Sequence, residues 1–268
     1  MTRGAIVSYF QRKIPARRER KDSMPGIRVI VNGAKGRMGQ ETVHAINAAE
    51  DMRLVAELDL GDDLAAGAKD ADAIVDFTTP VVAMENARII LSSGCAGVIG
   101  TTGFTPENIA ELRELAARRE KGLLIAPNFA IGAILMIRFA SEAARLMNEA
   151  EIIELHHPKK LDAPSGTAMR TAEEIAEAWR KTGVTPQPPA GARQPPRGLE
   201  TGGVCVHSVR LTGLLAHQEV IFGAEGQTLS IRHDTISRAS FMPGVLLGIR
   251  EMVRRSGFHY GLESLLFG

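Results

Sequence analysis

Two histidines and two lysines occupy five positions of the stretch ELHHPKKLDAPSGTA, which runs from Glu154 to Ala168. Histidine titrates near neutral pH, and a lysine crowded by other cations releases its proton more easily, so both are suited to donating protons. The turn DAPSGT leads into a helical pattern whose first backbone amides, near Ser165, Gly166 and Thr167, can bind a carboxylate. The stretch therefore predicts a site that binds an anion and supplies protons to it.

Two other interpretations fit these residues less well. A solvated basic loop would not require a tight turn and a helix start directly after it. A zinc site would use His156 and His157, but the stretch lacks HExxH spacing and its lysines repel a cation. We therefore predict no metal, and keep two alternatives: a metal-dependent hydrolase, and a nucleotide-sensing protein that has lost turnover.

The turn NGAKGRMGQ is a second candidate site, with Gly33, Gly36 and Gly39 spaced three residues apart after an apolar run. Glycines let backbone amides approach a pyrophosphate, and the start of the following helix adds partial positive charge. The spacing departs from the usual G-x-G-x-x-G, so a plain turn is the alternative. Asp59 ends the next strand-like run, where a carboxylate can bind ribose hydroxyls. We therefore predict dinucleotide binding.

Asp59 also bears on the choice between NADH and NADPH. Its charge would repel a 2′-phosphate, and Leu60 follows it where an arginine could bind that group. Lys35 and Arg37 flank the phosphate turn and could compensate for the carboxylate. We expect NADH to be preferred or used equally with NADPH.

Three more turns follow apolar runs: VDFTTP over Val75–Pro80, VIGTTGF over Val98–Phe104, and APNFAIG over Ala126–Gly132. They place hydroxyls and free amides at the carboxyl edge of a parallel sheet. Ordinary helix capping by threonine is the alternative interpretation of the threonine pairs.

The elements that must position these turns alternate in type from Ile27 onward. The spacing of Ile109, Leu112 and Ala116 is typical of one helix face. Because consecutive parallel strands need helical crossovers, the alternation predicts an α/β, Rossmann-type doubly wound parallel sheet over residues 24–127. The expected strands are Ile27–Val31, Leu54–Asp59, Ala73–Phe77, Gly97–Gly100 and Leu123–Ala126.

Residues 128–241 predict a second, substrate-binding domain of the α+β class with an open mixed sheet. We expect a helix from about Ile131 to Glu149, a strand over Glu151–Leu155 and a helix over Thr167–Lys181. Residues 183–203, rich in proline and glycine, are expected to form a long surface loop without regular structure. Later runs suggest an antiparallel sheet: Val204–Leu211, Gln218–Phe222 and Thr228–His233.

The two ends of the chain fall outside this division. The final helix, Met242–Arg255, opens residues 242–268, which are expected to pack back on the first domain. The first 23 residues carry seven Lys or Arg against two acidic residues, a composition that also occurs in transit peptides. Because Met24 directly precedes a strand, we favour a disordered extension or a misassigned start for residues 1–23.

Composition excludes several classes of function. A formal charge of +1 gives no global attraction for nucleic acid or acidic membrane, so electrostatic binding must be local. No apolar run is long enough for a membrane-spanning helix. Cys95 and Cys205 lack CxxC spacing, which argues against a disulfide framework or a thiolate metal site and favours a reducing compartment, the cytoplasm.

Five motifs carry a resemblance to a known family: GAKGRMG, VDFTTP, VIGTTGF, APNFAIG and ELHHPKKLDAPSGTA. From Ile27 to its end the chain resembles the dihydrodipicolinate reductases, which reduce 4-hydroxy-tetrahydrodipicolinate to tetrahydrodipicolinate in the diaminopimelate route to lysine. The resemblance implies an oxidoreductase that uses NADH or NADPH on a cyclic imine dicarboxylate. It also implies a homotetramer assembled through the sheets of the second domains.

The resemblance further implies a role for each residue that matches a family motif. The proton donors would be His156 and Lys160, and the substrate carboxylates would be held by His157, Gly166 and Thr167. The cofactor ligands would be Gly33, Ala34, Lys35, Gly36, Arg37, Met38, Asp59, Gly100, Thr101, Thr102, Ala126, Pro127, Asn128 and Phe129.

Overall fold

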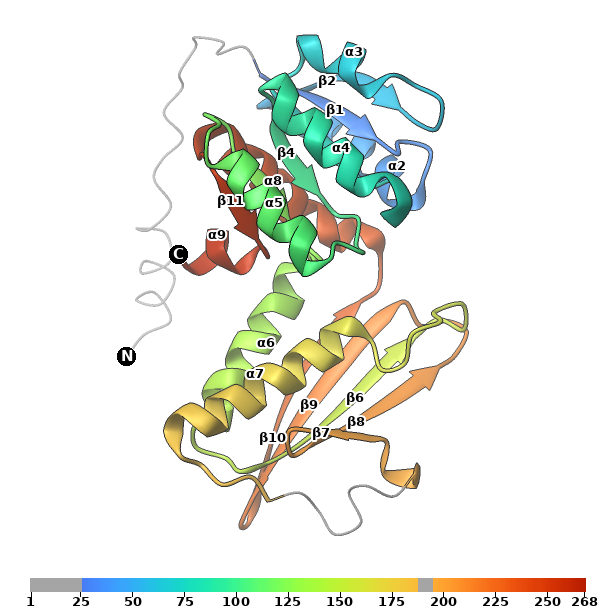
Figure 1. Ribbon diagram of the computed structural model, residues 1–268. Helices are drawn as coiled ribbons and strands as arrows, with labels where there is room; N and C mark the ends of the chain where they lie inside the picture. The colour runs from blue at the N-terminus through green and yellow to red at the C-terminus, as the bar shows by residue number, and fades with distance from the viewer. Residues whose placement is uncertain (1–25, 188–194) are drawn as a thin grey trace, which may run out of the picture.

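The computed structural model describes residues 26–187 and 195–268, in two lobes (Figure 1). The first lobe is built on a six-stranded sheet and the second on a five-stranded sheet. Residues 1–23, for which we expect an extension, lie outside the described residues. Within the described ranges, none of the helices has the length and apolar character that crossing a membrane requires.

All strands of the first sheet run parallel. They are β1 (Ile27–Asn32), β2 (Met52–Leu58), β3 (Ala73–Asp76), β4 (Ala96–Ile99), β5 (Leu123–Ile125) and β11 (Phe258–Tyr260), in the order β11-β5-β4-β3-β1-β2. The connecting helices are α2 (Arg37–Ala48), α3 (Leu64–Gly67), the 3-10 turn η1 (Ala68–Asp70), α4 (Pro80–Ser93) and α5 (Pro106–Ala116). The predicted doubly wound, Rossmann-type sheet is confirmed.

The central strands are apolar because helices cover both faces of the sheet. Every residue of β3 and β4 is buried. Full burial of a valine or isoleucine side chain stabilises the fold by about 1.5–3 kcal/mol. Four of the five expected strands end one residue earlier than predicted, so Asp59, Phe77, Gly100 and Ala126 lie just beyond the sheet edge. That shift places the predicted turns where ligands bind an open parallel sheet.

The C-terminal segment completes the first lobe. Helix α8 (Met242–Arg254) lies so close to the sheet that a Cβ on Gly248 would come 2.9 Å from a Leu124 methyl group. Strand β11 pairs with β5 and is followed by α9 (Glu263–Phe267). The sequence did not reveal β11, because three residues that include a histidine give no alternating pattern.

The second sheet is open and mixed, as predicted. Its strands are β6 (Glu149–His156), β7 (Leu199–Thr201), β8 (Val204–Arg210), β9 (Ala216–Ala224) and β10 (Gln227–Thr235), in the order β10-β9-β6-β8-β7. Helices α6 (Ile131–Ala144) and α7 (Gly166–Thr182) lie together on one face (Figure 1). Trp179 of α7 is buried there, and its indole nitrogen donates to the Met147 carbonyl at 2.8 Å.

Three details of the second lobe differ from the predictions. Strand β8 does not pair with β9; it lies parallel to β6, so the last three strands do not form one antiparallel sheet. Helix α6 ends at Ala144 because the chain enters β6 at Glu149, which pairs with Gly223. Part of the expected loop 183–203 is ordered as the 3-10 turn η2 (Pro195–Arg197) and as β7, and a further turn, η3 (Arg238–Phe241), precedes α8.

Candidate active site

The phosphate turn after β1 has a backbone that only glycine fits. Gly33 has a φ of 82°, and a Cβ there would lie 2.7 Å from the Phe77 carbonyl oxygen. A Cβ on Gly39 would lie 2.1 Å from the Gly33 carbonyl oxygen. Helix α2 begins at Arg37, with no acidic side chain in its first turn. Gly33 and Gly39 therefore let the backbone pack tightly where α2 begins, and the free amides of that helix start suit a pyrophosphate.

Asp59 secures this turn to the end of β2. Its carboxylate accepts the backbone amides of Lys35 and Leu60, both at 2.8 Å. These two bonds, the one from Leu60 first, lower the pKa of Asp59. A carboxylate has about four lone-pair sites, so acceptor capacity remains for a ribose hydroxyl. Lys35 and Arg37 are exposed on the same turn.

Asp76, the last residue of β3, connects the turns at the carboxyl edge of the sheet. It is completely buried and accepts hydrogen bonds from Asn32, Thr78, Asn86 and Thr101. Thr78 binds it through both the backbone amide and the hydroxyl. Sequence reasoning assigned Asp76 no role, although a carboxylate inside a wholly apolar strand was a usable signal.

These turns line a cleft, the cofactor cleft, along the edge of the first sheet. Its lining residues are Gly36, Arg37, Met38, Phe77, Thr78, Pro80, Gly100, Thr101, Thr102 and Arg238. Gly100 packs directly on Phe77, since a Cβ there would lie 2.0 Å from the ring. Gly33 and Ala34 are buried beneath the turn, and Ala126 and Phe129 are buried beside β5. Arg238 enters from η3, and nothing in its sequence context had marked it.

A larger cleft of about 1000 Å³, the interlobe cleft, lies between the two lobes. The first lobe contributes Thr102, Pro127 and Asn128 to its lining, and the second contributes His156, Lys160, Ser165, Gly166 and Thr167. The Asn128 side-chain amide donates to the Thr167 hydroxyl at 3.4 Å, across the cleft. Thr102 lines both clefts, so the cofactor cleft and the interlobe cleft adjoin at this residue.

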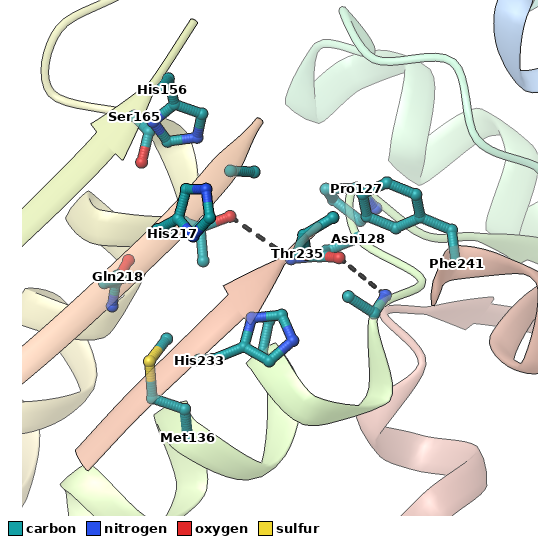
Figure 2. A pocket seen from close by; sticks show the side chains of 14 residues that line it. Pro127, Asn128, Met136, His156, Ser165, His217, Gln218, His233, Thr235 and Phe241 are labelled. Atoms are coloured by element: carbon teal, nitrogen blue, oxygen red, sulfur yellow. Dashed lines mark hydrogen bonds between the residues drawn. The ribbon is translucent and has the colours of Figure 1, made fainter. Parts of the chain in front are cut away.

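The predicted proton donors reach the interlobe cleft from one loop. His156 ends β6, and Figure 2 shows its ring beside Ser165, at the opposite end of the loop. Lys160 Nζ donates to both Asp162 carboxylate oxygens at 2.9 Å, and this bond lowers the pKa of Asp162. Ser165 caps α7 by accepting the Ala168 amide at 3.2 Å.

Glu154 lies under this loop and is completely buried. It binds the His156 ring, the Arg210 guanidinium and the Ser165 amide. Burial alone would raise the pKa of Glu154, but hydrogen bonds from His156, Arg210 and Ser208 outweigh burial and lower it to about 2. The carboxyl group is therefore ionised throughout the neutral range.

His157 differs from its neighbours in position, because it does not contribute to the lining given above for either cleft. Burial, followed by the positive charges of Arg37, His156, Arg238 and Lys160, lowers its pKa. His157 thus lies within electrostatic reach of two cations of the cofactor cleft. Lys159 is exposed.

A small polar pocket adjoins the interlobe cleft (Figure 2) and is lined by His156, Thr167, His217, Gln218 and His233, among others. The Gln218 amide nitrogen donates to the Thr171 hydroxyl at 2.7 Å, while its oxygen meets no donor among the described residues. His217 Nδ1 lies 2.6 Å from the Asp234 carboxylate, and burial lowers the pKa of His233. The sequence did not identify His217, Gln218 and His233, which lie on strands of ordinary pattern.

The described residues contain no cluster of three or more His, Cys, Asp or Glu side chains that could hold a metal ion. His156 and His157 are separated by the strand end: His156 faces the interlobe cleft, whereas His157 is absent from its lining. The two histidines therefore do not converge on one point, as ligands of one metal would.

Two relatives match nearly the whole chain. The 4-hydroxy-tetrahydrodipicolinate reductase of Nocardia farcinica is 52% identical over 244 residues, which make up 90% of this chain and 98% of the relative. The corresponding reductase of Streptomyces avermitilis is 52% identical over 247 residues, 91% of this chain and 99% of the relative.

One solved structure and two family matches name the same family as these relatives. A dipicolinate-bound dihydrodipicolinate reductase from Paenisporosarcina sp. TG-14 is 41% identical, covers 89% of this chain and 99% of its own, and superposes with a TM-score of 0.75. An engineered D-amino acid dehydrogenase bound to NADP⁺, 14% identical with a TM-score of 0.54, shares the fold alone. Residues 27–129 match the family described as "Dihydrodipicolinate reductase, N-terminus", and residues 132–266 match its C-terminus. The resemblance of the five motifs is confirmed, and the chain belongs to the dihydrodipicolinate reductase family.

Proposed function

We propose that this protein reduces 4-hydroxy-tetrahydrodipicolinate to tetrahydrodipicolinate with a nicotinamide cofactor, in the diaminopimelate route to lysine. The observation that carries the proposal is that Thr102 lines both clefts, which places a site for a nicotinamide ring next to a site for a substrate. The close relatives carry the name of this reaction.

The bound cofactor would supply a hydride to the conjugated cyclic imine that remains once the 4-hydroxyl group of the substrate has left as water. The chain's own part is to bind the dicarboxylate and to deliver protons as electron density moves toward the ring nitrogen. We assign proton donation to His156 and Lys160, whose side chains line the interlobe cleft. Lys160 Nζ forms an ion pair with Asp162, 2.9 Å away, which holds the lysine side chain in the loop.

The carboxylates of the substrate would bind at the start of α7. Gly166 and Thr167 line the cleft, and the first turn of the helix contains no acidic residue. Backbone amides at such a start hold anions without a countercharge. His157 stays a prediction as the third ligand, because it does not line the cleft.

The residues of the first lobe fit a nicotinamide dinucleotide. The glycine turn leads into the start of α2, whose free amides can bind a pyrophosphate. Six of the predicted cofactor ligands line the cofactor cleft: Gly36, Arg37, Met38, Gly100, Thr101 and Thr102. We propose that Asp59 binds the adenosine ribose and favours NADH, while Lys35 and Arg37 permit NADPH. Both basic side chains are exposed on the turn and can reach a 2′-phosphate.

An oxidation assay tests the proposed reaction. Aspartate semialdehyde, pyruvate and the preceding synthase generate the substrate in place, and absorbance at the dihydronicotinamide band reports turnover with NADH and with NADPH. We expect rapid, substrate-dependent oxidation of both, unaffected by EDTA. Binding of NADH without oxidation would instead support the nucleotide-sensing alternative, and loss of activity in EDTA would support the metal-dependent one.

We also propose that residues 24–127 act as the cofactor domain and residues 128–241 as the substrate domain, in a cytoplasmic homotetramer. One face of the second sheet is covered by α6 and α7, and among the described residues Figure 1 shows no α-helix on the other. Leu229 of β10 is 41% exposed. Light scattering should give a mass near four times 28.8 kDa; a mass of one chain would refute this assembly.

A further inference from the structure

We propose that Glu154, held by Arg210, is a positioning residue that sets both the imidazole of His156 and the turn that binds the substrate carboxylate. The inference rests on the proposed function, since it concerns how the proton donor is held. It assigns a role to a buried ion pair that touches neither substrate nor cofactor.

The geometry begins with the spacing of two residues on β6. Glu154 and His156 are two positions apart on one strand, so their side chains lie on the same face. The Glu154 carboxylate binds Nδ1 of the His156 ring. That contact occupies Nδ1 and leaves Nε2 as the nitrogen that can meet a substrate in the cleft.

Arg210 fixes the carboxylate from the neighbouring strand. Its Nη1 and Nη2 donate to the two Glu154 oxygens, each at 2.8 Å, in the paired geometry that guanidinium and carboxylate favour. Arg210 lies in register with His156 between β8 and β6, so strand pairing determines its position. Because Glu154 is fully buried, water cannot take the place of Arg210 at its carboxylate.

The same pair also holds the rest of the loop between His156 and Ser165. Glu154 accepts the Ser165 amide at 3.2 Å, at the end of the loop where α7 begins. Arg210 donates to the Asp162 carbonyl at 2.7 Å, midway along it. One ion pair therefore connects three parts of the loop: His156 at its start, Asp162, which pairs with Lys160, in its middle, and the proposed carboxylate-binding turn at its end.

The proton balance assigns Glu154 no proton to transfer. When His156 acts, its Nε2–H bond breaks and the proton passes to the substrate, while the neutral ring keeps its Nδ1–H bond to Glu154. Proton uptake from solvent then restores the imidazolium. Throughout the cycle the carboxylate orients the ring through its contact with Nδ1.

β6 contains a matched control. Glu151 also binds a histidine, His207, at 2.8 Å, and an arginine, Arg197. It is partly exposed and absent from the lining of the interlobe cleft. A purely structural role for Glu154 predicts that Glu154→Gln and Glu151→Gln change only stability.

Steady-state kinetics on the full-length chain distinguish the two roles. We expect Glu154→Gln to lower kcat about 10–100-fold, as loss of an orienting partner does, and to leave the NADH dissociation constant within about twofold. Glu151→Gln should leave kcat within about twofold. In a His156→Asn background the Glu154→Gln substitution should lower kcat no further, because the two residues act as a unit. A full additional loss in that background would overturn the inference.

A spectroscopic test does not depend on turnover, so it stands even if the proposed reaction is wrong. Nitrogen-15 labelling of histidine reports which ring nitrogen carries the proton, and the His156 signal is assigned by its absence in His156→Asn. We expect a single Nδ1–H tautomer in the wild-type protein at high pH and a mixture in Glu154→Gln. An unchanged tautomer in the variant would sink the inference.

Two gentler substitutions cover the case in which Glu154→Gln does not fold. Glu154→Asp keeps the charge but shortens its reach, and Arg210→Lys keeps the charge but removes one of the paired bonds. We expect both to lower kcat by about tenfold with near-normal circular dichroism. Normal kcat in both folded variants would contradict the positioning role.

Discussion

Two buried carboxylates organise the two lobes, and they differ in their partners. Asp76 in the first lobe and Glu154 in the second both have no exposed surface. The donors given above for Asp76 are all neutral: Asn32, Thr78, Asn86 and Thr101. Glu154 binds a guanidinium and an imidazole.

The difference corresponds to what each lobe has to hold. The turns above Asp76 must keep one shape for a dinucleotide, and amide and hydroxyl donors fix a shape without adding charge to the site. The loop above Glu154 carries the proposed proton donors, and the carboxylate places a fixed negative charge against the His156 ring. Neutral partners thus surround the buried carboxylate beneath the turns of fixed shape, and a guanidinium and an imidazole bind the buried carboxylate beneath the proposed proton donors.

The largest expected effect is on turnover, and it comes from removing the proposed proton donors of the second lobe. His156→Ala and Lys160→Ala should each lower turnover by about 10²–10⁴-fold, the usual loss on removing a general acid. NADH binding, measured by fluorescence titration, should stay within about twofold of wild type, because the proposed cofactor ligands lie in the first lobe. Near-normal turnover in either variant would remove that residue from the mechanism.

The charge of Glu154 should next appear in the pH dependence of stability. Its pKa is about 2 in the folded protein against an ordinary value of 4.5, so the stabilisation is complete above about pH 4.5 and is lost as the pH falls through about 2. The shift corresponds to about 3 kcal/mol at neutral pH. Urea unfolding of wild type and Glu154→Gln at several pH values measures it, with Glu151→Gln as the control. A stability difference that stayed constant from pH 7 to pH 2.5 would refute it.

Asp76→Asn should have a smaller effect on the reaction, one that is confined to cofactor binding. The asparagine side chain would turn its NH₂ group, a donor, toward groups that are themselves donors. An unmatched buried donor of this kind costs about 1–3 kcal/mol in stability. We expect the KM for NADH to rise about tenfold and kcat at saturating NADH to change less than about threefold. If kcat fell and the KM did not change, the proposed contrast between the two carboxylates would fail.

The smallest effect concerns the choice of cofactor. Asp59→Ala should weaken NADH and raise the relative use of NADPH by about threefold to tenfold, because a charge that repels the 2′-phosphate is removed. The loss of the bond to the Lys35 amide should weaken both cofactors equally, so the ratio of kcat/KM values isolates the ribose effect. An unchanged ratio would show that Asp59 only supports the turn.

The sequence predicted the parts of the site that are local in the chain. The phosphate turn, the threonine turns and the basic stretch each occupy a few consecutive residues, and each follows a strand whose end could be estimated. The links between turns were not predictable, because Glu154 meets Arg210 only through the pairing of β6 with β8. Asp76 likewise meets Thr101 only because β3 lies beside β4. The parallel pairing of β8 and the addition of β11 depend on the same non-local contacts.

The return of the chain to its first lobe has a consequence for synthesis. Arg250 binds Asp51 across 199 positions of sequence, and Lys121 Nζ donates to the Val253 carbonyl across 132. A ribosome therefore releases all of the first five strands, and then the whole second lobe, before the residues that complete the first sheet emerge. Until then the surface that α8 covers, including Val98 and Leu124, stays open to water and to chaperones.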